Sequence, residues 1–141
     1  MIIDDNKIDC FINQKIVALV YDNVTTTIFN SGVKALDYFR KISKEFDTTP
    51  LFVPDLILLD INMPVMNGFE FLQELVKTDA FIKNPIDVYF LSSSQNKKDI
   101  DDALDIEFCT GYINKPLSKD KLNKLVETKS VTVNKLKRNI I

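Results

Sequence analysis

Chemically reactive side chains stand where short apolar runs of the chain stop. The aliphatic run 56–59 passes directly into Asp60, although aspartate is a poor strand residue and is costly to bury. The other groups at such positions are two carboxylates, three hydroxyls and one ammonium: Asp4, Asp5, Ser92, Ser93, Ser94 and Lys115. Three carboxylates that lie together repel one another, and Mg²⁺, which prefers hard oxygen ligands, offsets that repulsion. Such a site suits phosphoryl transfer to a carboxylate.

In that chemistry the carboxylate attacks the phosphorus in line, while a metal ion neutralises the phosphoryl oxygens. Ser92 can donate a hydrogen bond to one oxygen, and Lys115 can pair with another as a point charge. The main-chain carbonyl of Asn62, just past Asp60, can add a metal ligand. Taken alone, each group has a simpler interpretation, because an Asp-Asp pair can cap a helix and a single lysine is usually a surface residue. The hypothesis therefore depends on whether the fold brings these groups together.

Hydrophobic periodicity predicts strands and helices in strict alternation. The predicted strands cover residues 1–3, 25–30, 55–61, 86–94 and 109–116. The predicted helices cover residues 8–20, 31–46, 68–83 and 96–108, and a last helix begins at residue 118. In the first helix the apolar residues at helical spacing are Ile8, Phe11, Ile12, Ile16, Leu19 and Val20. The nearly unbroken apolar run that ends at Asp60 is typical of a strand that helices cover on both faces.

This alternation predicts an α/β fold: a flavodoxin-like, doubly wound, five-stranded parallel sheet with strand order 2-1-3-4-5 and helices on both faces. In such sheets ligands bind outside the carboxyl ends of the strands. Strands one, three, four and five would adjoin, and their carboxyl ends carry the reactive groups. The fold therefore predicts that three carboxylates, one or more hydroxyls and the Lys115 ammonium converge.

Length and composition limit the alternatives. The 141 residues fit one domain, and the net charge of −2 indicates no general attraction to nucleic acid or membrane. Histidine is absent, which excludes histidine-based metal sites and nucleophile pairs. Cys10 and Cys109 are too few for a disulfide framework, so we expect reduced thiols and a cytoplasmic location. The basic segment 129–141 is best interpreted as a solvated helix end or tail.

At these residues the chain resembles the receiver domain of two-component response regulators, in particular the single-domain chemotaxis regulators. Four motifs carry the resemblance, "IIDDN", "LILLDINMPVMNGFEFL", "VYFLSSS" and "GYINKPLS". Any one of them would be weak, but together they are highly specific and span Ile2 to about Val126. We therefore expect a receiver domain over residues 1–127, and the end of the last helix or a C-terminal tail over residues 128–141.

The resemblance implies a role for each matched position. Asp60 would be the aspartate that a sensor histidine kinase phosphorylates, and Asp4 and Asp5 would hold Mg²⁺, for which Mn²⁺ can substitute. Asn62 would add its main-chain oxygen to the metal. Ser92 and Lys115 would contact the phosphoryl group. The remaining matches are the switch aromatic, the cis-proline, the turn after the acceptor and two positions thought to tune dephosphorylation: Tyr112, Pro116, Pro64, Gly68, Asn62 and Ser94.

The implied function is a phosphorylation-controlled signalling switch rather than an enzyme, with slow autodephosphorylation at most. Phosphorylation would draw Ser92 and Lys115 towards the new oxygens and turn Tyr112 inward. The outer face of the fourth helix, fifth strand and fifth helix would then change. The expected partners are a sensor histidine kinase or phosphotransfer protein and a downstream protein target. We expect no direct binding to nucleic acid or membrane, and either a monomer or a phosphorylation-linked homodimer.

Two features depart from the family pattern. Only three residues precede Asp4, so the first strand is shorter than is usual. The stretch between Asp5 and Asp60 is longer than is usual, and we place the excess in segment 43–54, away from the acceptor. That segment is a candidate for part of a partner surface.

Three rival functions use the same residues differently. The principal alternative is an adaptor with the receiver fold that binds a protein partner without being phosphorylated, which the complete set of reactive groups disfavours. An aspartyl-phosphate hydrolase of the haloacid dehalogenase type requires an acid two residues after its nucleophile, where this chain has Asn62. A flavin-binding flavodoxin would share the fold, but no loop rich in Ser, Thr and Gly follows the first strand.

Overall fold

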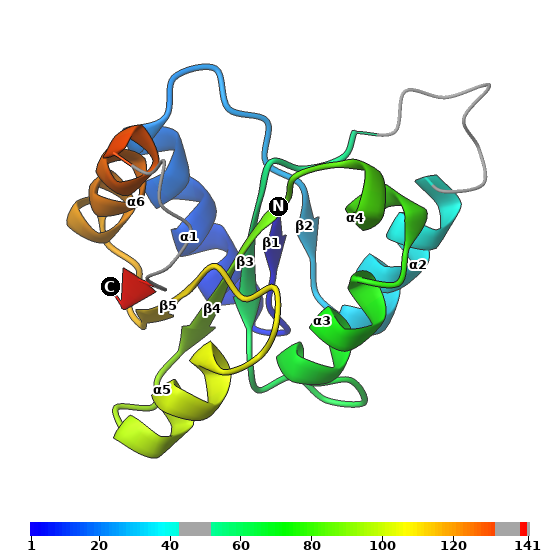
Figure 1. Ribbon diagram of the computed structural model, residues 1–141. Coiled ribbons are helices and arrows are strands. Elements are labelled where there is room, and N and C mark those ends of the chain that lie inside the picture. The colour runs from blue at the N-terminus through cyan, green and yellow to red at the C-terminus, as the bar shows by residue number, and fades with distance from the viewer. Residues whose placement is uncertain (43–51, 132–138, 141) are drawn as a thin grey trace.

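The computed structural model describes residues 1–42, 52–131 and 139–140, and in them it forms a single parallel sheet between two layers of helices (Figure 1). The strands are β1 (Ile2–Ile3), β2 (Ile28–Phe29), β3 (Leu56–Asp60), β4 (Asp87–Ser92), β5 (Gly111–Asn114) and β6 (Asn139–Ile140). The helices are α1 (Lys7–Val20), α2 (Gly32–Ile42), α3 (Gly68–Leu75), α4 (Asp79–Lys83), α5 (Lys97–Leu104) and α6 (Lys119–Val131).

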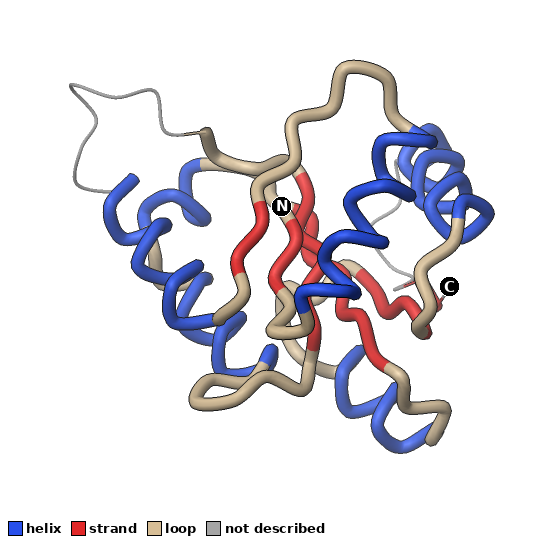
Figure 2. The backbone as a smooth tube through the Cα atoms, turned by 180° about the vertical axis from the view of Figure 1, so that it is seen from behind, coloured by secondary structure: helices blue, strands red, loops and turns tan. Residues whose placement is uncertain are grey.

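The strand order is β2-β1-β3-β4-β5-β6, and every neighbouring pair is parallel. The predicted five-stranded doubly wound sheet with order 2-1-3-4-5 is therefore confirmed. The two-residue strand β6 was not predicted, and it adds to the outer side of β5. Helices α1 and α6 cover one face of the sheet, and α2, α3, α4 and α5 cover the other (Figures 1 and 2).

The core divides into two clusters because successive strand residues point to opposite faces of the sheet. Ile57 and Leu59 of β3 join the cluster beneath α2 and α3, whereas Leu58 joins the cluster beneath α1 and α6. In β4, likewise, Phe90 belongs to the first cluster and Leu91 to the second. All of these side chains are almost completely buried, which explains why the strands are apolar at every position.

Of the apolar residues that identified the first helix, Ile16 and Val20 pack against the core, whereas the other four are exposed. Cys10, Asn13 and Val17 are buried, whereas Ile8 and Leu19 are each 69% exposed and Phe11 is 60% exposed. The helix packs through a narrow line of side chains against the sheet and α6. Helical spacing therefore found the element but only part of the face that packs, and α1 carries an apolar stripe on its outer side.

The predicted helix over residues 68–83 was wrong in its continuity, since the chain forms two helices there. Helix α3 ends at Leu75, and the Thr78 hydroxyl donates a hydrogen bond of 2.7 Å to the Leu75 carbonyl. The same oxygen accepts the N–H of Phe81 at 3.3 Å and so caps α4. A Thr-Asp pair inside the helical pattern thus begins a new helix, because a hydroxyl satisfies free N–H groups at a helix start.

The predicted helix over 31–46 is described as far as Ile42, and most of the long segment 43–54 lies outside the described residues. No helix in the described part of the chain is both long enough and apolar enough to cross a membrane.

Candidate functional site

The acidic residues come together because β1 and β3 are neighbours in register. Ile3 pairs with Leu59, so Asp4 and Asp60 follow at adjacent positions at the carboxyl ends of their strands. Carboxylate oxygens of Asp4, Asp5 and Asp60 lie within 4.8 Å of one another. Asp4 and Asp60 are buried, with 0% and 5% of their surface exposed, while Asp5 is exposed. The three side chains offer hard oxygen ligands, one of them from an exposed residue, and so fit a Mg²⁺ ion.

Lys115 joins the carboxylates from the far side of β4. Its Nζ lies 2.8 Å from Asp4 Oδ2, 2.6 Å from Asp60 Oδ1 and 3.1 Å from Asp9 Oδ2. The main-chain N–H of Lys115 donates to the Ser92 carbonyl at 2.7 Å, and the peptide bond from Lys115 to Pro116 is cis. The ammonium is therefore held at the acidic cluster by three ion pairs, and the main chain of Lys115 is bonded to the end of β4.

The contacts of Asp60 and Lys115 shift their pKa values in ways that follow from burial and charge. Burial raises the pKa of the Asp60 carboxyl, and the hydrogen bond and charge of Lys115 only partly oppose this. The negative charge of Asp4 raises it further, while the N–H of Asn62 lowers it. Burial would lower the pKa of Lys115, but its hydrogen bonds to Asp4 and Asp60 outweigh burial, so that pKa is raised. The lysine is a permanent cation at neutral pH.

A pH dependence of stability follows from the raised pKa of Asp60. Without metal, the folded protein binds the Asp60 proton more tightly than the unfolded chain, whose pKa is near 3.8. This contribution to stability is fully present below 3.8 and is lost as pH rises through the raised pKa. The free energy of unfolding of wild type, minus that of Asp60→Asn, should therefore increase as pH falls in EDTA. Urea denaturation of both proteins over a pH series measures this difference, and a difference that does not change with pH would contradict the prediction.

Ser92, Ser94 and Tyr112 form a second group at the ends of β4 and β5. Ser92 is buried, and its hydroxyl oxygen accepts the N–H of Ser94 at 3.1 Å. The Tyr112 hydroxyl donates to the Ser94 carbonyl at 2.8 Å, and the Asn114 amide donates to the same carbonyl at 2.9 Å. Tyr112 is 0% exposed, so its ring already lies inside the protein. The Tyr112 hydroxyl and the Asn114 amide thus both hold the loop that carries Ser94.

The turn after Asp60 is closed by short-range contacts. Gly68 N–H donates to the Ile61 carbonyl at 2.9 Å, and the Met66 N–H donates to the Pro64 carbonyl at 2.8 Å. Between Pro64 and Met66, Val65 has φ 70° and is 93% exposed. A β-branched residue at positive φ is an outlier, and such strain is found mainly at functional sites.

Helix α3 begins directly after this turn, with a capping box. The Asn67 side chain accepts the Glu70 N–H at 2.9 Å, and Glu70 accepts the Asn67 N–H at 2.9 Å. Asn62 is exposed beside Asp60, and its N–H donates to the Asp60 carboxylate. The turn therefore places both a fixed helix start and an exposed amide next to Asp60.

Two contributors to the site were not assigned to it from the sequence. Asp9 stands one helical turn after Asp5, and that spacing was a signal that its carboxylate could face the same cluster. Asn114 had no such signal, because its contact with Ser94 spans 20 residues and depends on the pairing of β4 with β5.

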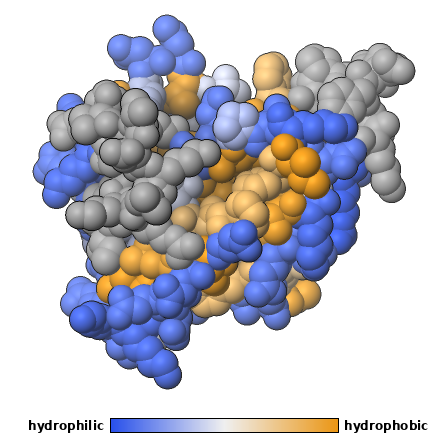
Figure 3. Space-filling view, viewed as in Figure 1, coloured by the Kyte–Doolittle hydropathy of each residue, from blue (hydrophilic) through white to orange (hydrophobic). Residues whose placement is uncertain are grey.

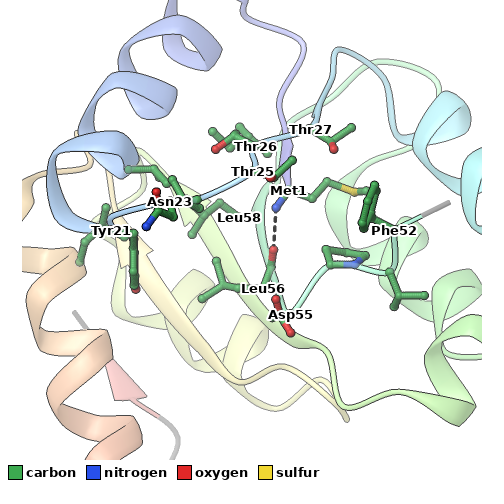
Figure 4. Close-up of a pocket in the computed structure, with 16 residues that line it drawn as sticks. Met1, Tyr21, Asn23, Thr25, Thr26, Thr27, Phe52, Asp55, Leu56 and Leu58 are labelled. Atoms are coloured by element: carbon green, nitrogen blue, oxygen red, sulfur yellow. Dashed lines mark hydrogen bonds between the residues drawn. The ribbon is translucent and has the colours of Figure 1, made fainter. Parts of the chain in front are cut away.

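A cavity with a volume of about 460 Å³ lies at the opposite end of the sheet (Figure 4). It is bounded by Met1, the loop Asn23–Thr27, Phe52 and the start of β3. The Met1 amino group donates to the Leu56 carbonyl at 2.7 Å there, where the short β1 begins between β2 and β3. This cavity is therefore separate from the acidic cluster, which occupies the carboxyl ends.

A parallel sheet in this order, with an acidic cluster at the carboxyl ends of its strands, defines a flavodoxin-like α/β protein. The chain belongs to the response regulator receiver domain family, whose model matches residues 1–127. Receiver domains act in two-component signalling, where they accept phosphoryl groups and are generally not enzymes. Members of the family bind Mg²⁺ in an acidic pocket. They interact with histidine kinases or phosphotransfer proteins and with downstream targets.

Individual relatives agree with this assignment. The chain is 39% identical over 108 residues to the probable transcriptional regulator ycf29 of Pyropia yezoensis, covering 77% of this chain and 43% of that protein. A two-component response regulator from Cytophaga hutchinsonii matches in structure with a TM-score of 0.74 and 28% identity, over 90% of this chain and 92% of that one.

A third match shows the fold alone, at 16% identity and a TM-score of 0.70, over 90% of this chain and 92% of the other. It is the receiver domain of a sensor histidine kinase from Pseudomonas aeruginosa PAO1, described with a magnesium ion coordinated in its active site cleft. The chain spans less than half the length of the first curated relatives that it matches, 21% of one and 43% of another.

Proposed function

We propose that this protein is a phosphorylation-dependent response regulator that accepts a phosphoryl group on Asp60 from a sensor histidine kinase. The observation that carries the proposal is the position of Lys115, whose Nζ bridges Asp4 and Asp60 at 2.8 and 2.6 Å beside a third carboxylate. The side chains of Asp4, Asp5 and Asp60, with the main-chain carbonyl of Asn62, would hold Mg²⁺. The ion would neutralise the phosphoryl oxygens. Substitution by Mn²⁺ stays a prediction.

In the proposed step a carboxylate oxygen of Asp60 attacks the phosphorus of a phosphohistidine on the kinase. The new O–P bond forms as the N–P bond breaks, and the imidazole nitrogen keeps the electron pair of that bond. Lys115 remains protonated and pairs with a phosphoryl oxygen, which its raised pKa favours. The Ser92 hydroxyl donates to another oxygen. These 141 residues contain no histidine, so the phosphohistidine must lie outside them.

The proposed switch face consists of α5, β5 and α6, which are the fourth helix, fifth strand and fifth helix expected from the sequence. Tyr112 lies buried in β5 and bonds to Ser94, two residues past Ser92. Movement of Ser92 towards phosphoryl oxygens would change the loop to which Tyr112 is bonded, and so alter the outer face of β5. We propose that a downstream protein recognises that face. A division near residue 127, a cytoplasmic location and a phosphorylation-linked homodimer remain parts of this proposal.

The test is incubation with acetyl phosphate and Mg²⁺, followed by intact-protein and peptide mass spectrometry. We expect one phosphoryl group on the peptide that contains Asp60, and none when EDTA replaces Mg²⁺. A protein that stays unmodified, while a known response regulator is modified in the same reaction, would instead support the unphosphorylated adaptor.

The exposed apolar stripe of α1 predicts where the kinase docks. Ile8 is 69% exposed in the first turn of α1, next to Asp9, which is bonded to Lys115. Truncation of a residue that contributes strongly to an interface costs more than about 1 kcal/mol, which corresponds to a change in affinity of about tenfold. Ile8→Ala should therefore slow phosphotransfer from a histidine kinase about tenfold but leave phosphorylation by acetyl phosphate unchanged.

A matched control is Ile82→Ala on α4. Ile82 is 68% exposed, but α4 covers the other face of the sheet and precedes β4, away from the carboxyl ends of the strands. We expect its phosphotransfer rate to equal that of wild type, measured with radiolabelled kinase. Equal slowing in both variants would contradict docking through α1.

A further inference from the structure

β5 is an edge strand of the receiver fold, and the chain covers that edge with a segment of its own. β6 runs parallel to β5, with Asn139 opposite Gly111 and Ile140 opposite Tyr112. Figure 1 shows β6 beside β5, close to where α6 and α5 flank the sheet. An edge strand presents N–H and C=O groups that an added strand can bond. The pairing therefore removes part of a surface that another chain could use.

The covered edge is connected to the acceptor site by a short series of contacts. Ile140 pairs with Tyr112, and the Tyr112 hydroxyl donates to the Ser94 carbonyl at 2.8 Å. The Ser94 N–H donates in turn to the Ser92 hydroxyl oxygen at 3.1 Å. Ser92 ends β4, directly beside the strand that ends in Asp60. A segment that binds this edge thus contacts the residue through which the proposed switch acts.

The end of α5, which lies beside this edge, and the sequence just before β6 carry opposite charges. The end of α5 and the loop after it are acidic, with exposed Asp101, Asp102, Asp105 and Glu107, and no ion pair among the described residues neutralises them. The start of α5 carries exposed Lys97 and Lys98. Figure 3 shows the hydrophilic surface of α5 below the apolar centre of this side of the molecule. The sequence just before β6 contains Lys135, Lys137 and Arg138 and no acid. Charge complementarity therefore favours a basic segment of this chain as the occupant.

We propose that β5 is a strand-addition site, and that Asn139–Ile140 of the same chain is its resident occupant, which a protein partner must displace to use the α5-β5-α6 face. The statement about partners rests on the proposed function, whereas the pairing itself does not. A two-residue strand gains little from its own hydrogen bonds, but its covalent connection supplies a high effective concentration. Such an occupant is displaceable by a partner that pairs along more of β5, as in other cases of strand addition.

The pairing is tested by hydrogen exchange in the full chain, without any phosphodonor. Asn139→Pro/Ile140→Pro removes both N–H donors of β6, and Asn139→Ala/Ile140→Ala is the matched control that keeps them. We expect amides in the peptide 109–116 to exchange about tenfold faster in the proline variant than in wild type or the alanine variant. Equal exchange in all three proteins would overturn the proposal, and so would protection that appears only in concentrated protein, because the strand would then come from a second copy.

Occupancy of the site is tested by adding a labelled synthetic peptide with the sequence of residues 132–141. The proline variant should bind it at least about tenfold more tightly than wild type or the alanine variant, because its own β6 no longer competes. Equal binding by wild type and the proline variant would overturn the proposal. The same measurements in an Asp60→Asn background separate this inference from the phosphorylation proposal, since neither exchange nor peptide binding requires a phosphate acceptor.

Discussion

Asp60→Asn is expected to reduce phosphorylation by acetyl phosphate and Mg²⁺ to the level of the blank. The carboxamide has nearly the same shape as the carboxylate but supplies no anionic oxygen to attack phosphorus. Asp60 is buried and ends β3, so a substitution of equal size leaves the strand and its neighbours in place. In EDTA at neutral pH the variant should be at least as stable as wild type, because burial of the charged carboxylate is unfavourable, as its raised pKa indicates.

The matched control for this substitution is Asp55→Asn. Asp55 is exposed just before the same strand, at the end of the sheet that faces away from the acidic cluster. Asp55→Asn makes the same change in net charge as Asp60→Asn. We expect it to be phosphorylated normally, measured as the modified fraction in intact-protein mass spectra. Full modification of Asp60→Asn would identify another residue as the acceptor and would refute the assignment.

Gly68→Ala should be the most damaging small substitution in the acceptor turn. A Cβ at Gly68 would lie 2.5 Å from the Asp60 carbonyl oxygen and 3.0 Å from the Ile61 Cα, and both of these are main-chain atoms. Main-chain atoms of a buried strand cannot move aside cheaply, so we expect a loss of about 2–3 kcal/mol in the free energy of unfolding. The displaced atoms belong to Asp60 and its neighbour, and the rate of phosphorylation should therefore fall as well.

Gly32→Ala provides the control, because Gly32 and Gly68 each begin a helix. At Gly32 a Cβ would lie 3.2 Å from the Met66 carbonyl oxygen and 3.4 Å from atoms of two methionine side chains. Methionine side chains adapt, and alanine favours the helix over glycine, so we expect a change within about 1 kcal/mol. Urea denaturation measures the free energy of unfolding of both variants. Losses of similar size in the two would show that the space around Gly68 is not limiting.

Strand order and the acidic cluster were predictable because they depend on rules that act along the whole sheet. Apolar runs of four to six residues between helices predict a parallel sheet, and its carboxyl ends necessarily carry the residues that stop each run. The meeting of Asp4 and Asp60 needed no side-chain detail, since the register Ile3–Leu59 places them side by side.

Features that depend on local competition or on distant pairing were not predictable in the same way. The break at Thr78 required a hydroxyl cap to outweigh an apolar pattern that continues through Phe81. The exposed stripe of α1 has the spacing of a buried face, and only packing against α6 reveals which side is covered. β6 consists of two residues, too short for any periodicity, and its partner β5 lies far away in the sequence.

The ion pairs of Lys115 also have a consequence for the choice of cation. The ammonium bonds Asp4 Oδ2 and Asp60 Oδ1, and both of these carboxylates would have to serve a metal ion. Lys115 would therefore compete with a metal ion for these two oxygens, and its raised pKa keeps it charged at neutral pH. A cation that takes either of these two oxygens must displace the ammonium from it, which weakens metal affinity relative to a cluster of the same acids without a lysine. Occupancy by the ion should consequently follow its free concentration, and a phosphoryl group on Asp60 would give the displaced ammonium a new partner.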